Sequence, residues 1–509
     1  MTAADLFATP ATVRALSEAR AAVVLVGSYD GSGNYGDIAQ FDAAMELVGR
    51  LGPAVVALPV LERVHLRNHD WLAEESGVNA PFALFLDGNG EADDGLVAAP
   101  APRELAFGAC YLYGGGYLNG AWGERKLAML EAAESLLAGA GVATPARVAS
   151  GLQVDPAWIE GCAPTLQSFD LLGARDPISG AAFVALGGEA EVRETGDDAV
   201  GVLRRLTPAK SPAANDEALH LNLHFAEHEW MGERPETVLD FYRGFVAELG
   251  RLAERPLRIQ PLIAYFDGRI DEHPAAERLR AACADLGAEV AETLVLRPAT
   301  LAEAVPQLGG AALTLSCSYH VALTSLLLEV PAILVGDNPY YEQKAAGLTA
   351  DFGLPAAFTI TSSVDSAEQA AAVFPFLFED GDRQEARRGI TEGASRLRQR
   401  RTEAEMELLT RLGRGALSGL ASLAVDQDDR LRRRSAEPAQ LHVQLAEIQT
   451  ELEEQRQLAA ESPLDVELRA QEAEARAEEA HRALAVALGS RSWRMAAPLR
   501  RAGSLLRRR

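Results

Sequence analysis

The sequence is poor in cysteine and contains no long apolar run. No two of its four cysteines (Cys110, Cys162, Cys283 and Cys317) are close enough for a CxxC pair or a zinc-ligand pattern. We therefore expect free, buried thiols and a reducing compartment. No stretch approaches the roughly 18 apolar residues of a membrane-spanning helix, and the first residues lack the charged start and apolar core of a secretory signal. These absences predict a cytoplasmic protein.

Basic residues are in the minority, with 48 Lys and Arg against 73 Asp and Glu and a net charge of −25. Nucleic-acid binding needs a basic surface that neutralises phosphates, so we do not expect a nucleic-acid partner. The acidity is explained by solubility alone. The sequence also lacks a GxGxxG fingerprint and a Walker A lysine. The adjacent pair Asp197 and Asp198 is too little to predict a metal site, and no cofactor is expected.

Short apolar runs alternate with longer amphipathic segments over most of the chain, which is typical of parallel strands joined by helices. The predicted strands are 22–27, 54–58, 82–87, 109–114, 146–151 and 169–174, then 219–225, 257–263, 293–296, 311–316 and 331–336. Predicted helices include 38–50, 123–138, 236–254 and 275–286. This pattern predicts an α/β protein with two Rossmann-like lobes. A ligand cleft is expected between them, at the carboxyl ends of the strands.

A segment rich in Pro, Ser, Asn and Asp separates the two sets of strands and reads as a linker. After about residue 380 the sequence becomes helical and charged, with a heptad-like seam at Leu441, Leu445, Ile448 and Leu452. This seam predicts either self-association through a coiled coil or a solvated helix lying on the body. The predicted divisions are an N-terminal lobe (1–206), a linker (207–218), a C-terminal lobe (219–380), a helical segment (381–430), coiled-coil-like helices (431–488) and a basic tail (489–509).

The basic tail carries seven arginines and no acidic residue, which reverses the charge of the rest of the chain. Two interpretations are open. The tail could dock on an anionic membrane surface, at the inner face of the membrane, or it could fold onto the acidic body of its own chain.

Two glycine-rich motifs follow predicted strands. The first, GSYDGSGNYGDIA (27–39), contains Asn34 and Asp37, which are candidates for the cleft, although Asp37 could simply cap the next helix. The second, YLYGGGYLNGAWG (111–123), places Gly114, Gly115 and Gly116 after a buried strand. Glycines supply no side chains for packing, so they favour a place where the backbone approaches a phosphate or carboxylate closely.

Four further side chains follow predicted strands and are candidates for the same cleft: Gln153, Arg175, His320 and Lys344. An arginine at the carboxyl edge of a sheet is suited to bidentate binding of a carboxylate or phosphate, although a salt bridge would explain it equally. His320 begins an apolar helix, where it is either a general acid or base or a structural residue. Lys344 comes one strand later, and the fold could bring it to the same cleft.

Taken together and in order, these motifs resemble the signature blocks of polysaccharide pyruvyl transferases. The blocks are GNYGD (33–37), YGGGY (113–117), GLQ (151–153), GARD (173–176), GDDA (196–199) and SYHVALTSLLLEVPAILVG (318–336) with a lysine after it. The resemblance implies a GT-B-like pair of lobes and phosphoenolpyruvate as the donor substrate. It also implies a donor pocket lined by Arg175, His320 and Lys344. One position departs from the pattern, because Ser318 stands where the family usually has an arginine.

The implied reaction moves a pyruvyl group onto two hydroxyls of a cell-surface glycan, or of a lipid-linked glycan precursor, and forms a cyclic ketal. Two other functions fit the same pair of lobes. One is a glycosyltransferase that uses a nucleotide sugar, which would need a carboxylate for the ribose, and only Glu329 and Asp337 stand near the expected place. The other is a scaffold without catalytic activity that acts in polysaccharide assembly.

Overall fold

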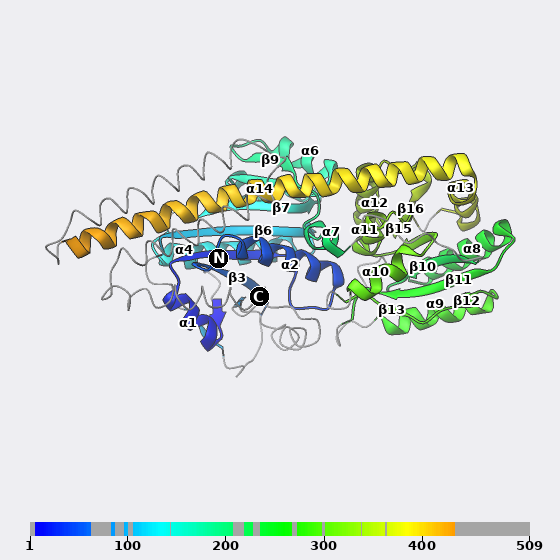
Figure 1. The fold of residues 1–509 in the computed structure, drawn as a ribbon, viewed down its shortest axis with the longest axis horizontal. Helices are drawn as coiled ribbons and strands as arrows, with labels where there is room; N and C mark the ends of the chain where they lie inside the picture. The colour runs from blue at the N-terminus through cyan, green and yellow to red at the C-terminus, as the bar shows by residue number, and fades with distance from the viewer. Residues whose placement is uncertain are drawn as a thin grey trace.

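The fold consists of two α/β lobes, with one long helix running along both (Figure 1). It is taken from a computed structural model that describes residues 6–62, 83–86, 96–99, 105–142, 144–206, 218–227, 235–266, 272–297, 301–336, 338–361 and 364–432. Each lobe is built on a mostly parallel sheet with helices packed on it. The predicted α/β class with two Rossmann-like, GT-B-like lobes is therefore confirmed. The coiled-coil-like helices and the basic tail lie outside the described residues.

The N-terminal sheet has the strand order β5-β1-β4-β3-β2-β6-β7-β8-β9, in which only β1 runs antiparallel to its neighbours. Its central strand β2 is a fully buried run of Ala, Val and Leu that ends in Gly27, and β7 is buried from Val148 onward, as both covered faces of a parallel sheet require. The strands are β1 (Leu6–Ala8), β2 (Ala21–Gly27), β3 (Val55–Glu62), β4 (Leu84–Leu86), β5 (Val97–Ala98), β6 (Phe107–Leu118), β7 (Ala146–Val154), β8 (Leu171–Ala174) and β9 (Glu191–Glu194).

Several helices of this lobe begin at the residue types that favour helix starts. Thr9, Asn34 and Asp176 each cap a helix through a side-chain oxygen, and Pro177 occupies the first turn after Asp176. The helices are α1 (Pro10–Glu18), α2 (Tyr35–Gly49), α4 (Gly123–Gly139), α5 (Ala163–Gln167), α6 (Pro177–Leu186) and α7 (Val200–Leu206). The proposed linker follows α7, and its residues 207–217 lie outside the described part of the chain.

The C-terminal sheet has the order β12-β11-β10-β14-β15-β16, with β13 also paired to β11. Its pairs are parallel throughout. The strands are β10 (Leu219–His224), β11 (Leu257–Ile263), β12 (Glu289–Val290), β13 (Leu294–Val295), β14 (Leu313–Ser316), β15 (Ala332–Gly336) and β16 (Thr359–Thr361). The helices are α8 (Pro235–Ala253), α9 (His273–Asp285), α10 (Leu301–Gly309), α11 (Tyr319–Leu327), α12 (Pro339–Phe352) and α13 (Ser366–Phe378).

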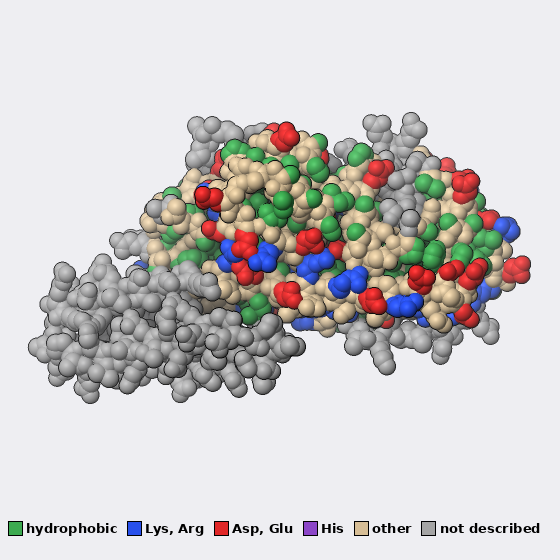
Figure 2. All heavy atoms as spheres, turned by 90° about the horizontal axis from the view of Figure 1, so that it is seen from above, with side chains coloured by type: hydrophobic (Ala, Val, Ile, Leu, Met, Phe, Trp, Pro, Cys, Tyr) green, Lys and Arg blue, Asp and Glu red, His purple; other side chains and the backbone are tan. Residues whose placement is uncertain are grey.

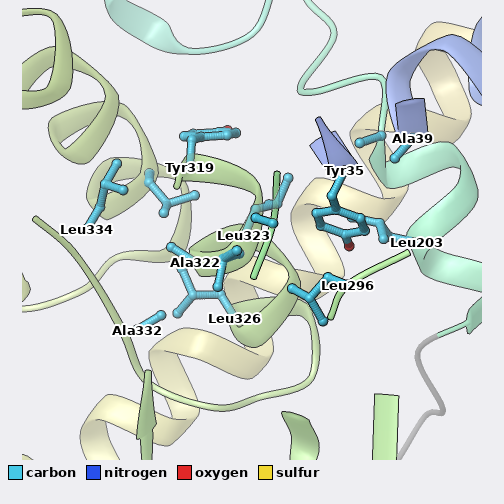
Figure 3. Packing of buried hydrophobic residues seen from close by; sticks show 14 of the residues in the cluster. Tyr35, Ala39, Leu203, Leu296, Tyr319, Ala322, Leu323, Leu326, Ala332 and Leu334 are labelled. Carbon is cyan, nitrogen blue, oxygen red and sulfur yellow. The ribbon is translucent and has the colours of Figure 1, made fainter. Parts of the chain in front are cut away.

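The two lobes share one hydrophobic core at their junction. In Figure 3, Tyr35 and Ala39 of α2 and Leu203 of α7 approach Leu323 of α11, and one buried cluster includes residues from both sheets. The hydroxyl of Tyr35 lies 2.7 Å from that of Thr324, also on α11. Backbone hydrogen bonds add to this contact, since Tyr35 donates to Ala264. The lobes are therefore packed against each other as well as linked in sequence.

The last described helix, α14 (Asp380–Arg432), extends from the C-terminal lobe across the N-terminal lobe (Figure 1). In the view from above, basic and acidic side chains are interspersed over this face of the molecule (Figure 2). Arg400 of α14 lies 2.6 Å from Asp351, and Arg396 lies 3.9 Å from Glu392. This face thus carries ion pairs rather than a field of one sign. None of the described helices combines the length and apolarity needed to cross a bilayer.

Two details of the local structure differ from the sequence-based predictions. Strand β6 does not end at Gly114, the last residue of the predicted strand, but continues through Gly115 and Gly116 to Leu118, with a register shift against β7 between Gly115 and Leu118. Asp37 is not the cap of α2. That position belongs to Asn34, whose side chain accepts from the Gly36 N–H at 3.0 Å, and Asp37 lies in the first turn. All four cysteines are free and buried, as predicted.

Candidate active site

A cavity of about 260 Å³ lies between the lobes, at the carboxyl ends of β2, β6, β8, β10 and β14. It receives most of the side chains that the sequence singles out. Those that line it are Asn34, Asp37, Gly115, Gly116, Arg175, His320 and Lys344, together with Ser318. Gly114 and Gln153 lie behind this lining. The predicted candidates therefore gather at one place, although they come from both lobes.

Arg175 directly follows β8 and is only 2% exposed. Its guanidinium stacks on the ring of Tyr319, with Cζ 4.1 Å from the ring centroid, and Nη1 lies 3.6 Å from Oδ2 of Asp197. The Nε and Nη2 atoms have no hydrogen-bond partner among the described residues. Buried arginine nitrogens are rarely left unpaired, because desolvation is costly. Arg175 is thus arranged to receive an anion from the cavity.

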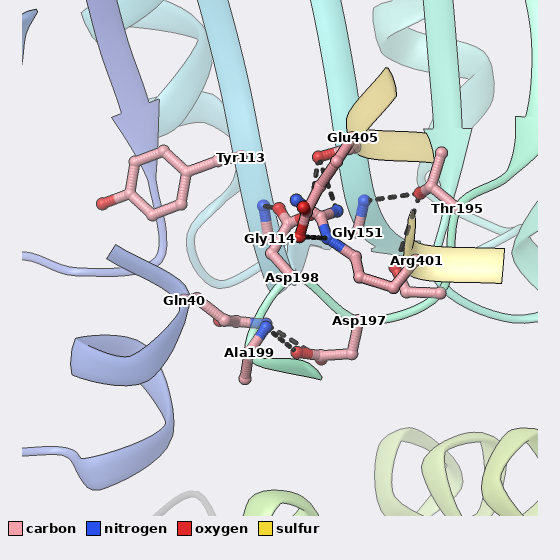
Figure 4. Close-up of polar contacts among 12 residues, drawn as sticks. Gln40, Tyr113, Gly114, Gly151, Thr195, Asp197, Asp198, Ala199, Arg401 and Glu405 are labelled. Carbon is pink, nitrogen blue, oxygen red and sulfur yellow. Dashed lines mark hydrogen bonds and ion pairs between the residues drawn. The ribbon is translucent and has the colours of Figure 1, made fainter. Parts of the chain in front are cut away.

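His320 lies in the first turn of α11 and faces the same carboxylate across the lobe boundary. Its Nε2 is 3.4 Å from Oδ2 of Asp197. Asp197 also accepts from the side-chain amide of Gln40 at 2.9 Å and from the Ala199 N–H at 2.8 Å (Figure 4). Burial raises the pKa of the Asp197 carboxyl, but His320, Arg175 and the Ala199 N–H together outweigh burial and lower that pKa to about 2. Asp197 therefore presents a full negative charge to Arg175 and His320 at neutral pH.

The position of His320 depends on a glycine of the first motif. A Cβ atom added to Gly36 would lie 1.8 Å from Nδ1 of His320, far inside van der Waals contact. The start of α2 can therefore approach the imidazole only because residue 36 has no side chain. This explains the glycine of the GNYGD motif by its contact with the histidine, and a phosphate is not needed to account for it.

Lys344 lies in α12, one turn after the helix start capped by Asn338. Its Nζ is 4.0 Å from the ring centroid of Tyr340 and 5.2 Å from that of Tyr341. Burial, and then repulsion by Arg175, lower the pKa of the Lys344 ammonium to about 7. A second cation thus lines the cavity beside Arg175, and its charge is held only weakly at neutral pH.

Asp37, in the first turn of α2, also lines the cavity. Burial raises the pKa of its carboxyl to about 6, and attraction by His320 opposes this rise in part. A carboxyl with a pKa in this range can take up and release a proton near neutral pH. The side chain of Asn34 is engaged in capping α2, as described above, and therefore has a structural function at the edge of the cavity.

The three glycines differ in their surroundings. The N–H of Gly114 donates to Oδ2 of Asp198 at 2.7 Å, so it is not available to a ligand. Gly115 adopts a φ of 114°, which favours glycine. A Cβ on Gly116 would lie 2.7 Å from the Tyr340 hydroxyl and 3.3 Å from Cε of Lys344. The missing side chain at Gly116 therefore lets Tyr340 and Lys344 of α12 pack against the strand.

Gln153 lies in β7 and is 2% exposed. Its Oε1 has no hydrogen-bond partner among the described residues. That atom would be 3.0 Å from a Cβ on Gly116, so Gln153 stands directly behind the glycine run.

Sequence reasoning missed several residues of the cavity, including Tyr319, Tyr340 and Lys126. Lys126 of α4 is 5% exposed, and its Nζ lies 5.7 Å from the ring centroid of Tyr117. Burial lowers the pKa of its ammonium. A lysine in the first turn of a helix that follows a glycine-rich strand is the signal that could have found it.

Comparison with known proteins identifies the family. A family model described as polysaccharide pyruvyl transferase matches residues 34–339, which is more than half of the chain. The chain belongs to the polysaccharide pyruvyl transferase family. As a member, the protein is a transferase. Arg175, Asp197 and His320 fall inside the matched region of this pyruvyl transferase, whereas Lys344 and all of α14 lie beyond it. A comparison with curated protein sequences gave no significant match.

Similar solved structures include two UDP-N-acetylglucosamine 2-epimerases. The epimerase from Neisseria meningitidis, bound to UDP-GlcNAc, is 10% identical, with a TM-score of 0.42 over 75% of this chain and 99% of the epimerase. The putative epimerase from Listeria monocytogenes is 11% identical, with a TM-score of 0.45 over 82% and 98% of the two chains. An O-GlcNAc transferase mutant from Thermobaculum terrenum is 12% identical, with a TM-score of 0.38 over 80% and 69%.

Proposed function

We propose that the transferase uses phosphoenolpyruvate as its donor and binds it in the cavity between the lobes. Phosphoenolpyruvate carries a carboxylate and a phosphate on one small carbon frame. Two cations on adjacent walls suit such a molecule, because Arg175 can bind one anion through two parallel hydrogen bonds and Lys344 can meet the other. The observation that carries the proposal is the pair of unpartnered, buried nitrogens on Arg175.

The reaction needs proton transfers in both directions, and the cavity has a group for each. We assign His320 as the general acid that protonates the methylene carbon of the donor. Asp37 is then the general base that accepts the proton of the attacking sugar hydroxyl. Positioned acids and bases of this kind contribute rate factors of about 10²–10⁴. The negative charge of Asp197, which is ionised at neutral pH, holds the imidazole and stabilises positive charge on it.

The proposed reaction consists of two successive attacks of sugar hydroxyls on the same carbon of the donor. A proton from His320 adds to the methylene carbon and makes it a methyl group, while positive charge develops at the neighbouring carbon. A first sugar hydroxyl attacks that carbon, forms a C–O bond and loses its proton to Asp37. The C–O bond to phosphate then breaks, and inorganic phosphate leaves with the bonding electron pair. A second hydroxyl of the same sugar attacks the resulting oxocarbenium centre, loses its proton to the imidazole of His320, which regenerates the general acid, and closes the ketal.

The acceptor belongs to the class of glycans, and we propose a cell-surface glycan or its lipid-linked precursor. We further propose that the basic tail (489–509) brings the enzyme to the inner face of the membrane, where lipid-linked acceptors lie, and that residues 431–488 associate with a second copy. The domain limits at 206 and 219 are likewise proposed.

The direct test of the donor is binding of phosphoenolpyruvate to the wild-type protein and to Arg175→Lys, which keeps the charge but loses the forked geometry.

A further inference from the structure

Helix α14 contacts elements that carry the site residues through two arginines one turn apart, Arg398 and Arg401. Arg398 donates from Nη2 to the carbonyl of Leu327 at 2.6 Å. Leu327 is the last residue of α11, the helix that begins with Tyr319 and His320. Arg401 donates to Asp198, the neighbour of Asp197. Residues three apart on a helix lie on the same face. One face of α14 therefore holds the element of His320 in one lobe and the turn of Asp197 in the other.

The contact of Arg401 is fully enclosed. Arg401 and Asp198 both have 0% side-chain exposure, and Glu405 lies 3.3 Å from Nε of Arg401. A buried arginine and a buried carboxylate are retained only where their mutual geometry is well supported, because desolvation opposes both charges. Figure 4 shows Arg401 entering from α14 toward Asp198 and the strand with Gly114.

Asp198 connects Arg401 to the residues that line the cavity through two further hydrogen bonds. Its Oδ2 accepts the N–H of Gly114 at 2.7 Å, and its Oδ1 accepts the hydroxyl of Ser150 at 2.6 Å. Gly115 and Gly116, which follow Gly114, line the cavity. Asp197, which precedes Asp198, contacts both Arg175 and His320. The GDD turn thus has one carboxylate toward the donor side and the other toward α14.

We propose that α14 is a brace for the active site: Arg398 and Arg401 together fix the separation of His320 and Asp197 across the lobe boundary, which makes both arginines positioning residues for donor binding. This rests on the proposed function of the cavity, but the brace itself is a property of the free protein. It assigns a role in the site to a helix that lies outside the region matched by the family.

The test compares Arg401→Met and Arg398→Met with Arg411→Met in the full chain. Arg411 lies on the same helix, but its ion pairs are with Glu191 and Glu407 instead of Asp198. We expect Arg401→Met to weaken phosphoenolpyruvate binding by about tenfold or more, and Arg401→Lys, which keeps the charge, to restore part of it. Arg411→Met should bind the donor like the wild type even if its Tm falls. If the wild type binds phosphoenolpyruvate, equal donor affinity in Arg401→Met and Arg411→Met overturns the proposal.

Removing Arg401 alone leaves Asp198 buried without its partner, so that variant could fail to fold. The double variant Asp198→Asn with Arg401→Met removes both charges and guards against this. We expect it to fold but still to bind the donor weakly, since the link to α14 is gone. Recovery of full donor affinity in the double variant would show that only the unpaired charge mattered, which contradicts the brace.

Hydrogen exchange of the protein without ligand separates this inference from the donor assignment. Peptides covering residues 113–118 and 195–199 should exchange faster in Arg401→Met than in Arg411→Met. If the wild type fails to bind phosphoenolpyruvate while this difference is present, the donor assignment is wrong and the brace stands. If exchange in those peptides is unchanged, the brace is wrong whatever the donor.

Discussion

His320 and Asp197 face each other across the boundary between the two lobes, with Nε2 and Oδ2 separated by 3.4 Å. The histidine comes from α11 of the C-terminal lobe, and the aspartate from the turn before α7 of the N-terminal lobe. The same carboxylate lies 3.6 Å from Arg175. The buried carboxylate of Asp197 therefore orients both His320, the proposed general acid, and Arg175, the proposed donor-binding residue. The site is complete only when the two lobes are packed together.

Replacement of His320 by alanine should lower turnover by about 10² or more, as expected for loss of a general acid. The measurement is the rate of phosphate release with phosphoenolpyruvate and a glycan acceptor, alongside circular dichroism to show that the fold is kept. Donor affinity should change little. Full activity in His320→Ala would mean that the histidine is only a structural residue of α11.

Replacement of Gly36 by alanine should reduce activity by displacing the imidazole, because the new methyl group would overlap Nδ1 of His320. Alanine is favoured over glycine inside a helix by about 0.5–1 kcal/mol, so loss of helix propensity cannot explain a defect. Gly49, near the end of the same helix, has nothing within contact of an added Cβ and provides the matched control. Normal turnover in Gly36→Ala would show that the contact does not constrain His320.

Replacement of Arg175 by lysine should mainly weaken donor binding. A hydrogen bond to a charged group contributes about 1.5–3 kcal/mol, so losing the forked pair should raise the Kd for phosphoenolpyruvate by about tenfold or more. Isothermal titration calorimetry measures this directly. A changed turnover number with an unchanged Kd would move Arg175 from the donor-binding role to a role in the chemical step.

The pH dependence of kcat/KM should be bell-shaped. Asp37 must be ionised to act as a base, so activity should rise as the pH passes its pKa of about 6. Lys344 must be protonated to bind an anion, so activity should fall as the pH passes its pKa of about 7. Asp37→Asn should remove most activity, leaving no rise in kcat/KM at acid pH, and Lys344→Arg, whose guanidinium stays protonated, should move the alkaline fall to higher pH. A wild-type profile that is flat across this range would contradict both assignments.

The strand pattern could be predicted from the sequence because buried parallel strands are continuous apolar runs, and β2, β10 and β11 lie where those runs are. The short edge strands β5, β12 and β16 could not, since two or three residues are too few to show a period. The glycines of β6 were expected to follow the strand. Pairing with β7 keeps them in it, and that pairing is a long-range contact which no local pattern records.

The members of the site were largely predictable, whereas their partners were not. Arg175, His320 and Lys344 follow strands whose carboxyl ends meet in one cleft, so topology alone brings them together. Asp197 was visible only as part of a GDDA motif, and its neighbour Asp198 faces the other way, toward α14. Arg401 lies in a charged helix with many arginines, and the sequence around it does not distinguish it from the others. Only the packing of α14 shows that this one is buried.

The basic tail should bind anionic vesicles. Each arginine near an anionic leaflet contributes roughly 1 kcal/mol, and Trp493 favours the interface. The full chain should therefore pellet with anionic vesicles at low salt and be released at high salt. A chain that ends at Leu488 should stay in solution. Equal behaviour of the two chains would favour the alternative, in which the tail binds its own acidic body.

The identity of the donor is the central claim, and a thermal-shift comparison of phosphoenolpyruvate with a set of nucleotide sugars tests it most directly. A ligand that binds only the folded state raises Tm with its concentration. Phosphoenolpyruvate should raise Tm, this rise should be lost in Arg175→Ala, and the nucleotide sugars should cause little or no rise. Stabilisation by a nucleotide sugar, with none by phosphoenolpyruvate, would contradict it and favour a glycosyltransferase.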